Sequence, residues 1–210
     1  MHPSKSSITA TAASSRPSSG VSSTRQPSPP QPEDSVTDDP HPAPSIRAAT
    51  RADIDPIAVI EALSFYSIDE IFTPKQIARL IRSPNAIVLV AASPGSILGW
   101  GAVLHKRTRR GVTGRIYSIA IHPDARGQRL GDALARELIR QLREHAATRI
   151  YLEVRTDNEA AIRLYKSLGF TVARTLSDYY AQDIHAYSMR MDMLPISDED
   201  SVSVSVTRAT

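Results

Sequence analysis

The stretch from Ile119 to Leu134 carries the most specific chemical signal in the sequence. It reads as the end of a strand, a short loop containing Gly127, and a helix whose start contains Gly131. The first turn of a helix has unpaired backbone N–H groups and the positive end of the helix dipole, so it attracts phosphate. Glycine lets the backbone come close to such an anion. From these residues alone the stretch is either a phosphate site or an ordinary turn, and it lacks the G-x-G-x-x-G pattern of dinucleotide-binding folds.

Two titratable side chains further along could move a proton. Glu153 alternates with Leu152 and Val154 on a predicted strand, so its side chain lies on the opposite face from theirs. From the residues alone, the favoured interpretation is an exposed strand carboxylate paired with Arg155. Tyr165 lies on the apolar stripe of a predicted helix. It is either a core aromatic or a proton donor, because tyrosine combines an apolar ring with a polar hydroxyl.

Other polar residues give weaker signals. Asn158 lies inside the pattern Thr156-x-x-Glu159, which is typical of a capping box and would make it a first-turn residue. The basic run 105–110 falls at a glycine-containing turn without interleaved aromatic residues, which favours a solvated hairpin tip over nucleic-acid binding. The six histidines have no metal-site spacing and the chain has no cysteine, so no metal is expected.

The apolar period changes repeatedly along the chain and predicts alternating strands and helices. Helices are expected at 53–65, from Thr73 onward, at 127–145 and at 158–168. Strands are expected at 45–49, 86–92, 97–105, 115–121, 149–155, 170–176 and 184–193. This order contains β-α-β crossovers, so it predicts a mixed sheet that is partly parallel and has helices on both faces.

Composition divides the chain into three parts. Residues 1–45 include 25 Ser, Thr or Pro, and no Leu, Phe, Tyr or Trp precedes Leu63, which predicts a disordered tail. Residues 46–194 form the single predicted domain, and 195–210 form a flexible C-terminal tail. The domain holds 21 Lys/Arg against 15 Asp/Glu, a net charge of +6 that would suit a polyanionic cofactor. With no long apolar run and no signal-like start, a cytoplasmic protein without a membrane partner is expected.

The run Arg126-Gly127-Gln128-Arg129-Leu130-Gly131 resembles the acyl-CoA pyrophosphate loop of the GNAT acetyltransferases, usually written Q/R-x-x-G-x-G/A. Other stretches across residues 46–193 resemble the same family, and more narrowly its RimI-type ribosomal-protein-alanine N-acetyltransferases. These stretches are 152–155, Asn158, 160–162, Leu164-Tyr165, 168–170 and Tyr179-Tyr180. The resemblance implies an α/β GNAT fold, with a mixed, mostly antiparallel sheet, helices on both faces and a parallel pair at the acyl-CoA site.

The same resemblance implies a reaction, in which the acetyl group of acetyl-CoA moves to a primary amine by direct attack. Glu153 would be the general base, and Tyr165 would protonate the departing thiolate. The cofactor-binding residues that it implies are Ile119, Ala120, Ile121, Arg126, Gly127, Gln128, Arg129, Leu130, Gly131, Asp132 and Asn158. Tyr179 and Tyr180 would shape a peptide groove. The favoured acceptor is a protein N-terminal α-amine, for which a ribosomal protein is one candidate partner, and no nucleic acid is expected.

One residue departs from the family pattern, because Arg129 stands where the family usually has glycine. A side chain is tolerable there if φ stays negative, and the guanidinium could add a charge-assisted bond to phosphate. If the loop needs a positive φ, Arg129 would strain it and weaken CoA binding. Two other functions stay open: a small-molecule amine acetyltransferase, and a CoA-binding pseudoenzyme or sensor, which a weakened CoA site at Arg129 would favour.

Overall fold

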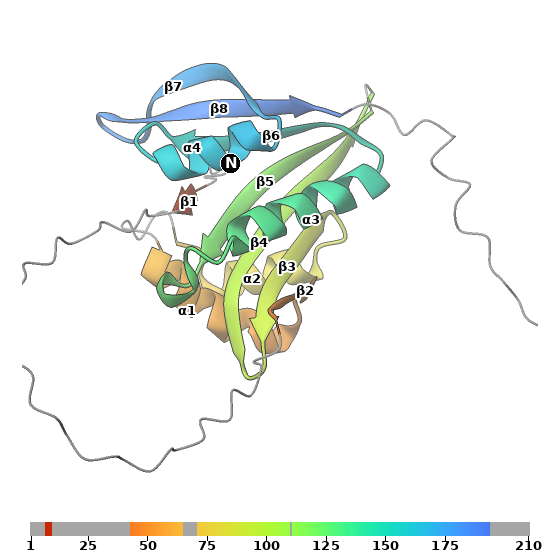
Figure 1. Cartoon of the computed structure of the whole chain (residues 1–210). Helices are drawn as coiled ribbons and strands as arrows, with labels where there is room; N and C mark the ends of the chain where they lie inside the picture. The colour runs from red at the N-terminus through yellow and green to blue at the C-terminus, as the bar shows by residue number, and fades with distance from the viewer. Residues whose placement is uncertain (1–6, 10–42, 65–70, 110, 194–210) are drawn as a thin grey trace, which may run out of the picture.

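The computed structural model describes residues 7–9, 43–64, 71–109 and 111–193 (Figure 1). The sheet has eight strands in the described residues, and seven of them follow one another in the order β2-β3-β4-β5-β6-β8-β7. They are β2 (Ser45–Ala48), β3 (Ala86–Ser93), β4 (Ser96–Thr108), β5 (Gly111–Ile121), β6 (Ala147–Arg155), β7 (Thr171–Ala181) and β8 (Ile184–Asp192). Along this order every neighbouring pair is antiparallel except β5 and β6, which are parallel. The predicted mixed, mostly antiparallel sheet is confirmed.

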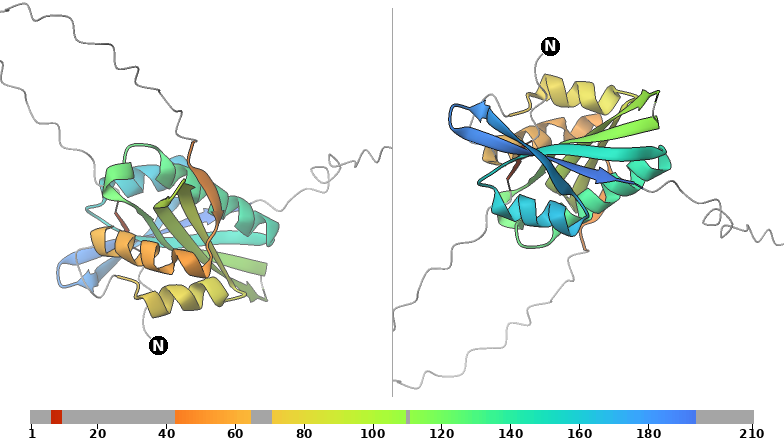
Figure 2. Two further views of the ribbon diagram at one scale, coloured as in Figure 1. Left: turned by 90° about the horizontal axis from the view of Figure 1, so that it is seen from below. Right: turned by 90° about the horizontal axis from the view of Figure 1, so that it is seen from above.

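Helices cover both faces of the sheet (Figures 1 and 2). On one face lie α1 (Ile54–Ser64) and α2 (Pro74–Arg82), which enclose a core centred on Trp100. On the other lie α3 (Leu130–Glu144) and α4 (Glu159–Ser167), over the larger core. Close packing on that face depends on Gly101, because a Cβ there would lie 2.9 Å from Leu138 Cδ1. No helix in the described ranges is long and apolar enough to cross a membrane.

The parallel strands β5 and β6 separate part of the way along their length. They pair from Val112↔Ala147 to Arg115↔Tyr151. Directly beyond, the register of β5 with β4 shifts, so that Tyr117 is an extra residue. A bulge of this kind bends a strand and increases its twist. The bulge thus coincides with the place where β5 leaves β6 and a V-shaped opening begins.

A short strand from the N-terminal region lies in that opening. β1 (Ser7–Thr9) runs parallel to β5, and its register places Ser7 to Thr9 opposite Ser118 to Ala120. The composition of this segment predicts a disordered tail, so the strand is a departure from the sequence-based expectation. Apart from 7–9 and 43–45, the predicted N-terminal tail lies outside the described residues, as does the predicted C-terminal tail.

Several element boundaries differ from their predicted positions, and three of these differences affect the predicted site residues or the basic run. α3 begins at Leu130 rather than at residue 127, because Gly127 and Arg129 both have positive φ and cannot continue a helix backward. β5 begins at Gly111, so the predicted basic turn is shorter than the run 105–110. β7 continues to Ala181, which places Tyr179 and Tyr180 inside the strand instead of after it.

Candidate active site

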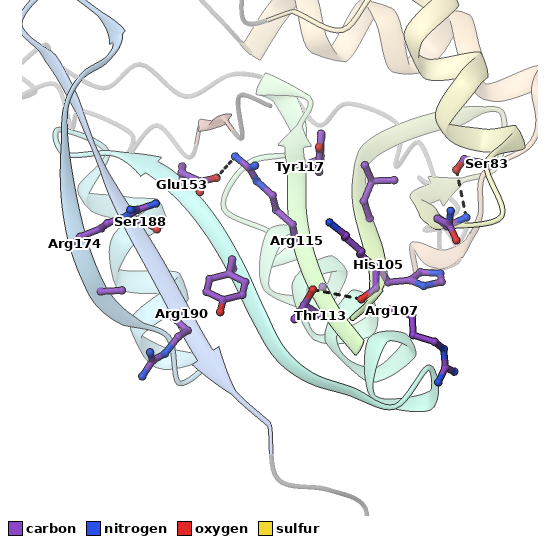
Figure 3. A pocket seen from close by; sticks show the side chains of 16 residues that line it. Ser83, His105, Arg107, Thr113, Arg115, Tyr117, Glu153, Arg174, Ser188 and Arg190 are labelled. Carbon is purple, nitrogen blue, oxygen red and sulfur yellow. Dashed lines mark hydrogen bonds and ion pairs between the residues drawn. The ribbon is translucent and has the colours of Figure 1, made fainter. Parts of the chain in front are cut away.

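Glu153 lies on β6 at the vertex where β5 and β6 separate. Its side chain is on the α1/α2 face of the sheet and only 8% of the residue is exposed. Arg115 of β5 donates from Nη2 to Glu153 Oε2 at 2.5 Å (Figure 3). Arg155 instead donates to Asp157, so the alternative of an exposed Glu153–Arg155 pair is wrong.

Burial and nearby charges act on this carboxyl group in opposite directions. Burial raises the pKa of Glu153 above its ordinary value, while the Arg115 guanidinium and Arg174 oppose the rise. A raised pKa makes a carboxylate a stronger proton acceptor, as general-base chemistry requires. Oε2 is engaged by Arg115, and no bond from another described residue is made to Oε1. Glu153 therefore combines an ion-pair anchor with an oxygen that can accept a proton.

Arg115 connects Glu153 to the predicted tyrosine pair. The same Nη2 donates to Tyr179 Oη at 3.1 Å. Tyr180 packs edge-on against Tyr179, with ring centroids 5.1 Å apart. Sequence reasoning missed Arg115, because the only available signal was its position on a strand one residue before buried Ile116. The contact with Glu153 follows from the parallel register of β5 and β6.

Tyr165 lies on α4, on the opposite face of the sheet from Glu153. The residue is fully buried, packs edge-on against Phe170, and its hydroxyl has no hydrogen-bond partner among the described residues. Burial raises its pKa well above the ordinary value, and Tyr180 adds to the rise. A buried hydroxyl without a partner is costly. Tyr165 thus remains a protonated donor at neutral pH and fits a ligand that accepts its hydrogen bond.

The predicted pyrophosphate loop lies between β5 and α3. Gly127 has φ +81° and Arg129 has φ +59°, so the strained alternative for Arg129 is the one that the structure adopts. Arg129 is also the N-cap residue of α3, and its side chain makes no cap hydrogen bond. By contrast, the N-cap side chains of α2 and α4 each accept a backbone N–H. The start of α3 therefore keeps backbone donors for an anion.

The remaining predicted cofactor residues fall around the same opening. Ile119, Ala120 and Ile121 are buried at the end of β5. Asp132 lies in the first turn of α3 and is paired with Arg136 at 2.8 Å. Asn158 is the N-cap of α4, where its Oδ1 accepts from Ala161 N at 3.1 Å. The predicted Thr156-x-x-Glu159 capping box is therefore wrong, because the helix begins only at Glu159.

A cavity of about 870 Å³ opens on the α1/α2 face next to Glu153. The end of β4 and the start of β5 form one wall, and β7 and β8 form the other (Figure 3). Glu153 and Arg115 line it, while Tyr179 and Tyr180 are not among its lining residues. No group of three or more His, Asp and Glu side chains gathers as a metal site within the described ranges.

A second buried carboxyl group, Glu61 of α1, was missed in the sequence. It is fully buried and accepts hydrogen bonds from Trp100 Nε1, Ser118 Oγ and Phe72 N, each at 3.0 Å. Burial raises its pKa to about 7, against the effect of these donors. Its position four residues after buried Ile57 is the only available signal. Through these bonds Glu61 connects α1 to β4, to β5 and to Phe72, just before α2.

Comparison with known proteins identifies the family. The acetyltransferase (GNAT) family matches residues 53–170, which is more than half of the chain, and the chain belongs to this family. The N-alpha-acetyltransferase RimI of Mycobacterium tuberculosis is 34% identical over 149 residues, covering 70% of this chain and 92% of the relative. The chain is thus a RimI-like GNAT N-acetyltransferase.

Two solved structures support the fold. The ribosomal-protein-S18-alanine N-acetyltransferase of Escherichia coli superposes with a TM-score of 0.64 at 24% identity, covering 74% of this chain and 97% of that one. A putative acetyltransferase from Salmonella typhimurium, solved with its cofactor acetyl-CoA, gives a TM-score of 0.62 at 23% identity, covering 73% and 96%. The predicted GNAT fold is confirmed, and its parallel pair is β5 with β6.

Proposed function

We propose that the protein transfers the acetyl group of acetyl-CoA to the N-terminal α-amine of a protein or peptide. The observation that carries this proposal is the placement of Glu153 and Tyr165 on opposite faces of the sheet beside the β5–β6 opening. An acceptor in the cavity on the α1/α2 face would meet Glu153. A thioester in the opening would meet Tyr165 from the α4 side. The name of the Mycobacterium tuberculosis relative supports an α-amine as the acceptor.

The residues around the opening fit acetyl-CoA. The start of α3 offers backbone donors to a pyrophosphate, and the Tyr165 hydroxyl lacks a partner among the described residues. The edge of β5 from Ser118 to Ala120 is not paired with β6, so its backbone is available to a ligand that takes the place of β1. When bound, acetyl-CoA supplies the activated acetyl group.

The proposed steps divide proton transfer between the two residues. Glu153, through a water molecule, accepts a proton from the acceptor ammonium. The neutral nitrogen then attacks the thioester carbonyl carbon and a C–N bond forms, the nitrogen loses its second proton to water, and the C–S bond breaks. Tyr165 donates its hydroxyl proton to the departing sulfur and recovers a proton from solvent. An α-amine, whose pKa is about 7.7–8.0, loses its proton near neutral pH far more readily than a lysine at about 10.4.

A single peptide with a free N-terminal alanine and an internal lysine tests the acceptor. After incubation with acetyl-CoA, fragmentation mass spectrometry should locate the label on the α-amine. A matched peptide with a blocked N-terminus should remain largely unlabelled. Label found mainly on lysine, or on neither amine while polyamines react well, would contradict the peptide acceptor. CoA binding without turnover of any amine would favour a sensor.

A further inference from the structure

The cavity beside Glu153 is strongly basic on both walls. Lys106 and Arg107 line it from the end of β4, and Arg174 and Arg190 line it from β7 and β8 (Figure 3). Arg115 lies between these walls, and Glu153 is the one carboxylate among the lining residues. Five cations against one carboxylate leave a net charge of +4.

Several of these charges are not neutralised by protein carboxylates. Arg115 is paired with Glu153, and Arg190 with Asp192 at 3.1 Å. Within the described part of the chain, Lys106, Arg107 and Arg174 form no ion pair. Elsewhere on the surface, exposed arginines such as Arg140 and Arg163 are paired along their helices. Other unpaired cations, such as Arg79, Arg82 and Arg143, are exposed elsewhere in the described part of the chain, so the cavity is distinguished by how many cations line its walls around a single carboxylate.

Lys106 and Arg107 belong to the basic run that the sequence places at a solvated hairpin tip. The structure places them on a strand instead, because β4 continues to Thr108, and both residues line the cavity. Thr113 Oγ1 of β5 hydrogen-bonds to the Lys106 carbonyl oxygen at 3.4 Å, across the same pair of strands. Both cations thus stand on a paired strand, where their backbone positions are fixed relative to Glu153, although the Arg107 side chain points away from Glu153 and contributes to the field at the rim of the cavity (Figure 3).

We infer that the acceptor is an acidic segment, with Asp or Glu among the first residues after the acetylated one. This inference rests on the proposed function, because it places the α-amine at Glu153 and the following residues between the two basic walls. Carboxylates there would reduce the mutual repulsion of the unpaired cations. They would also draw the acceptor in from solution, since a cleft lined by one sign of charge concentrates ligands of the opposite sign.

A peptide series measures this preference directly. Each peptide begins with alanine and differs only at its second to fifth residues, which are Asp/Glu, Ser/Asn or Lys. With the full chain and saturating acetyl-CoA, kcat/KM should be highest for the acidic peptide, by about tenfold over the neutral one, as two or three partly exposed ion pairs would give. The advantage should shrink as salt rises from about 0.05 M toward 1 M, where the screening length is only about 3 Å.

Charge reversal assigns the preference to this cavity. In the double variant Lys106→Glu/Arg107→Glu, the kcat/KM of the acidic peptide should fall to or below that of the neutral peptide. The matched control is Lys166→Glu, an exposed cation on α4 and therefore on the other face of the sheet. It should keep the full preference. Circular dichroism of each variant confirms that the fold is retained.

The outcomes separate this inference from the proposed function. Equal kcat/KM for acidic and neutral peptides, or a preference unchanged in the double variant, would overturn the acidic acceptor alone. Stronger inhibition by a short RNA than by an N-terminally blocked acidic peptide would overturn it in favour of a nucleic acid. Failure to acetylate any N-terminus in the series would overturn both proposals together.

Discussion

Glu153 gains its proposed role from its surroundings and not from its residue type. Burial raises its pKa while Arg115 holds it in place. Glu153→Gln should lower kcat by about 100-fold, the contribution of a lost general base, and leave acetyl-CoA affinity nearly unchanged. In the wild type, kcat/KM should fall as pH drops through this raised pKa, because the carboxyl group becomes protonated. Steady-state kinetics of the variant and of the wild type, measured across a range of pH, gives both the loss of kcat and the fall of kcat/KM.

The control for that measurement is Glu159→Gln, which removes an exposed carboxylate of α4 that, among the described residues, pairs with Arg163 alone. It should leave kcat unchanged. If a folded Glu153→Gln variant had the wild-type rate, Glu153 would have only a structural role.

Tyr165 is expected to act at the other end of the reaction. Tyr165→Phe keeps the ring that packs against Phe170 and removes only a hydroxyl with no described partner. The thermal midpoint should therefore hold or rise slightly, while kcat falls by about 10- to 100-fold. Rate measurements with thioesters of different leaving-group pKa distinguish the two roles. A thiol that leaves without protonation should restore the rate of a variant that lacks only the proton donor.

Arg129 has a left-handed conformation that glycine adopts at no steric cost. Its φ of +59° strains a residue with a Cβ, by about 1–2 kcal/mol. Arg129→Gly should raise the free energy of unfolding by up to about 1 kcal/mol, because glycine also gains entropy in the unfolded chain. If the strain opposes CoA binding, the Kd for CoA falls too.

Gln128→Gly is the matched control for Arg129→Gly. Gln128 adjoins Arg129 but is not among the residues with positive φ, so glycine there should destabilise. Urea unfolding and calorimetric titration with CoA measure both variants. A weaker affinity in Arg129→Gly would mean that the guanidinium contacts phosphate and outweighs the strain.

At the scale of elements, the order of strands and helices was predictable because it depends on local periodicity. The long-range contacts of the site were not. Arg115 and Glu153 are 38 residues apart, and they meet only because Arg115 is in register with Tyr151 on parallel strands. Glu61 illustrates the same limit, since a carboxyl group on an apolar helix face is interpretable only once Trp100 and Ser118 are placed beside it.

Glu61 should make the packing of α1 on the sheet depend on pH. Its folded-state pKa of about 7 lies above the ordinary 4.5, so the folded protein holds a proton that the unfolded chain releases. The resulting stabilisation is present at pH 4 and is lost as pH rises through 7. It amounts to at most about 3 kcal/mol, since one pKa unit corresponds to about 1.4 kcal/mol. Urea unfolding at pH 5 and pH 8 measures the loss.

The variant Glu61→Gln isolates this contribution, because Glu153 also has a raised pKa and acts in the same direction. The amide does not titrate. The decrease in the free energy of unfolding between pH 5 and pH 8 should therefore be smaller than in the wild type, by the amount that Glu61 contributes. Glu159→Gln, at an exposed position, should keep the full decrease. Equal decreases in Glu61→Gln and the wild type would show that Glu61 stays ionised.

At the scale of the whole molecule, the two faces of the sheet give the two substrates separate approaches. The α3/α4 face carries Tyr165 and the uncapped helix start. The α1/α2 face carries Glu153 and the basic cavity. The separation of β5 from β6 connects the two faces, because no ladder joins these two strands beyond the pair Arg115↔Tyr151. The site therefore depends on how the sheet is assembled as much as on any motif.

The N-terminal segment should affect how tightly the protein binds its cofactor. The sequence predicts that residues 1–44 can be removed without effect, because they lack apolar side chains. However, β1 pairs with Ser118 to Ala120, the same edge that acetyl-CoA would use. Both cannot occupy it, so removal of residues 1–44 should lower the KM for acetyl-CoA while kcat at saturation and the thermal midpoint stay nearly unchanged. If β1 is docked in nine of ten molecules, the apparent KM falls about tenfold.

Single substitutions locate the competition within the segment. Ile8→Pro removes a backbone donor from the middle of β1 and should reproduce the lower KM of the shortened chain. Ser14→Pro, outside the three paired residues, should leave KM unchanged. An identical KM in the full chain, the shortened chain and Ile8→Pro would mean that β1 does not compete with the cofactor, and that the segment is dispensable as the composition predicts. A marked loss of thermal stability on shortening would instead mean that β1 stabilises the opening of the sheet.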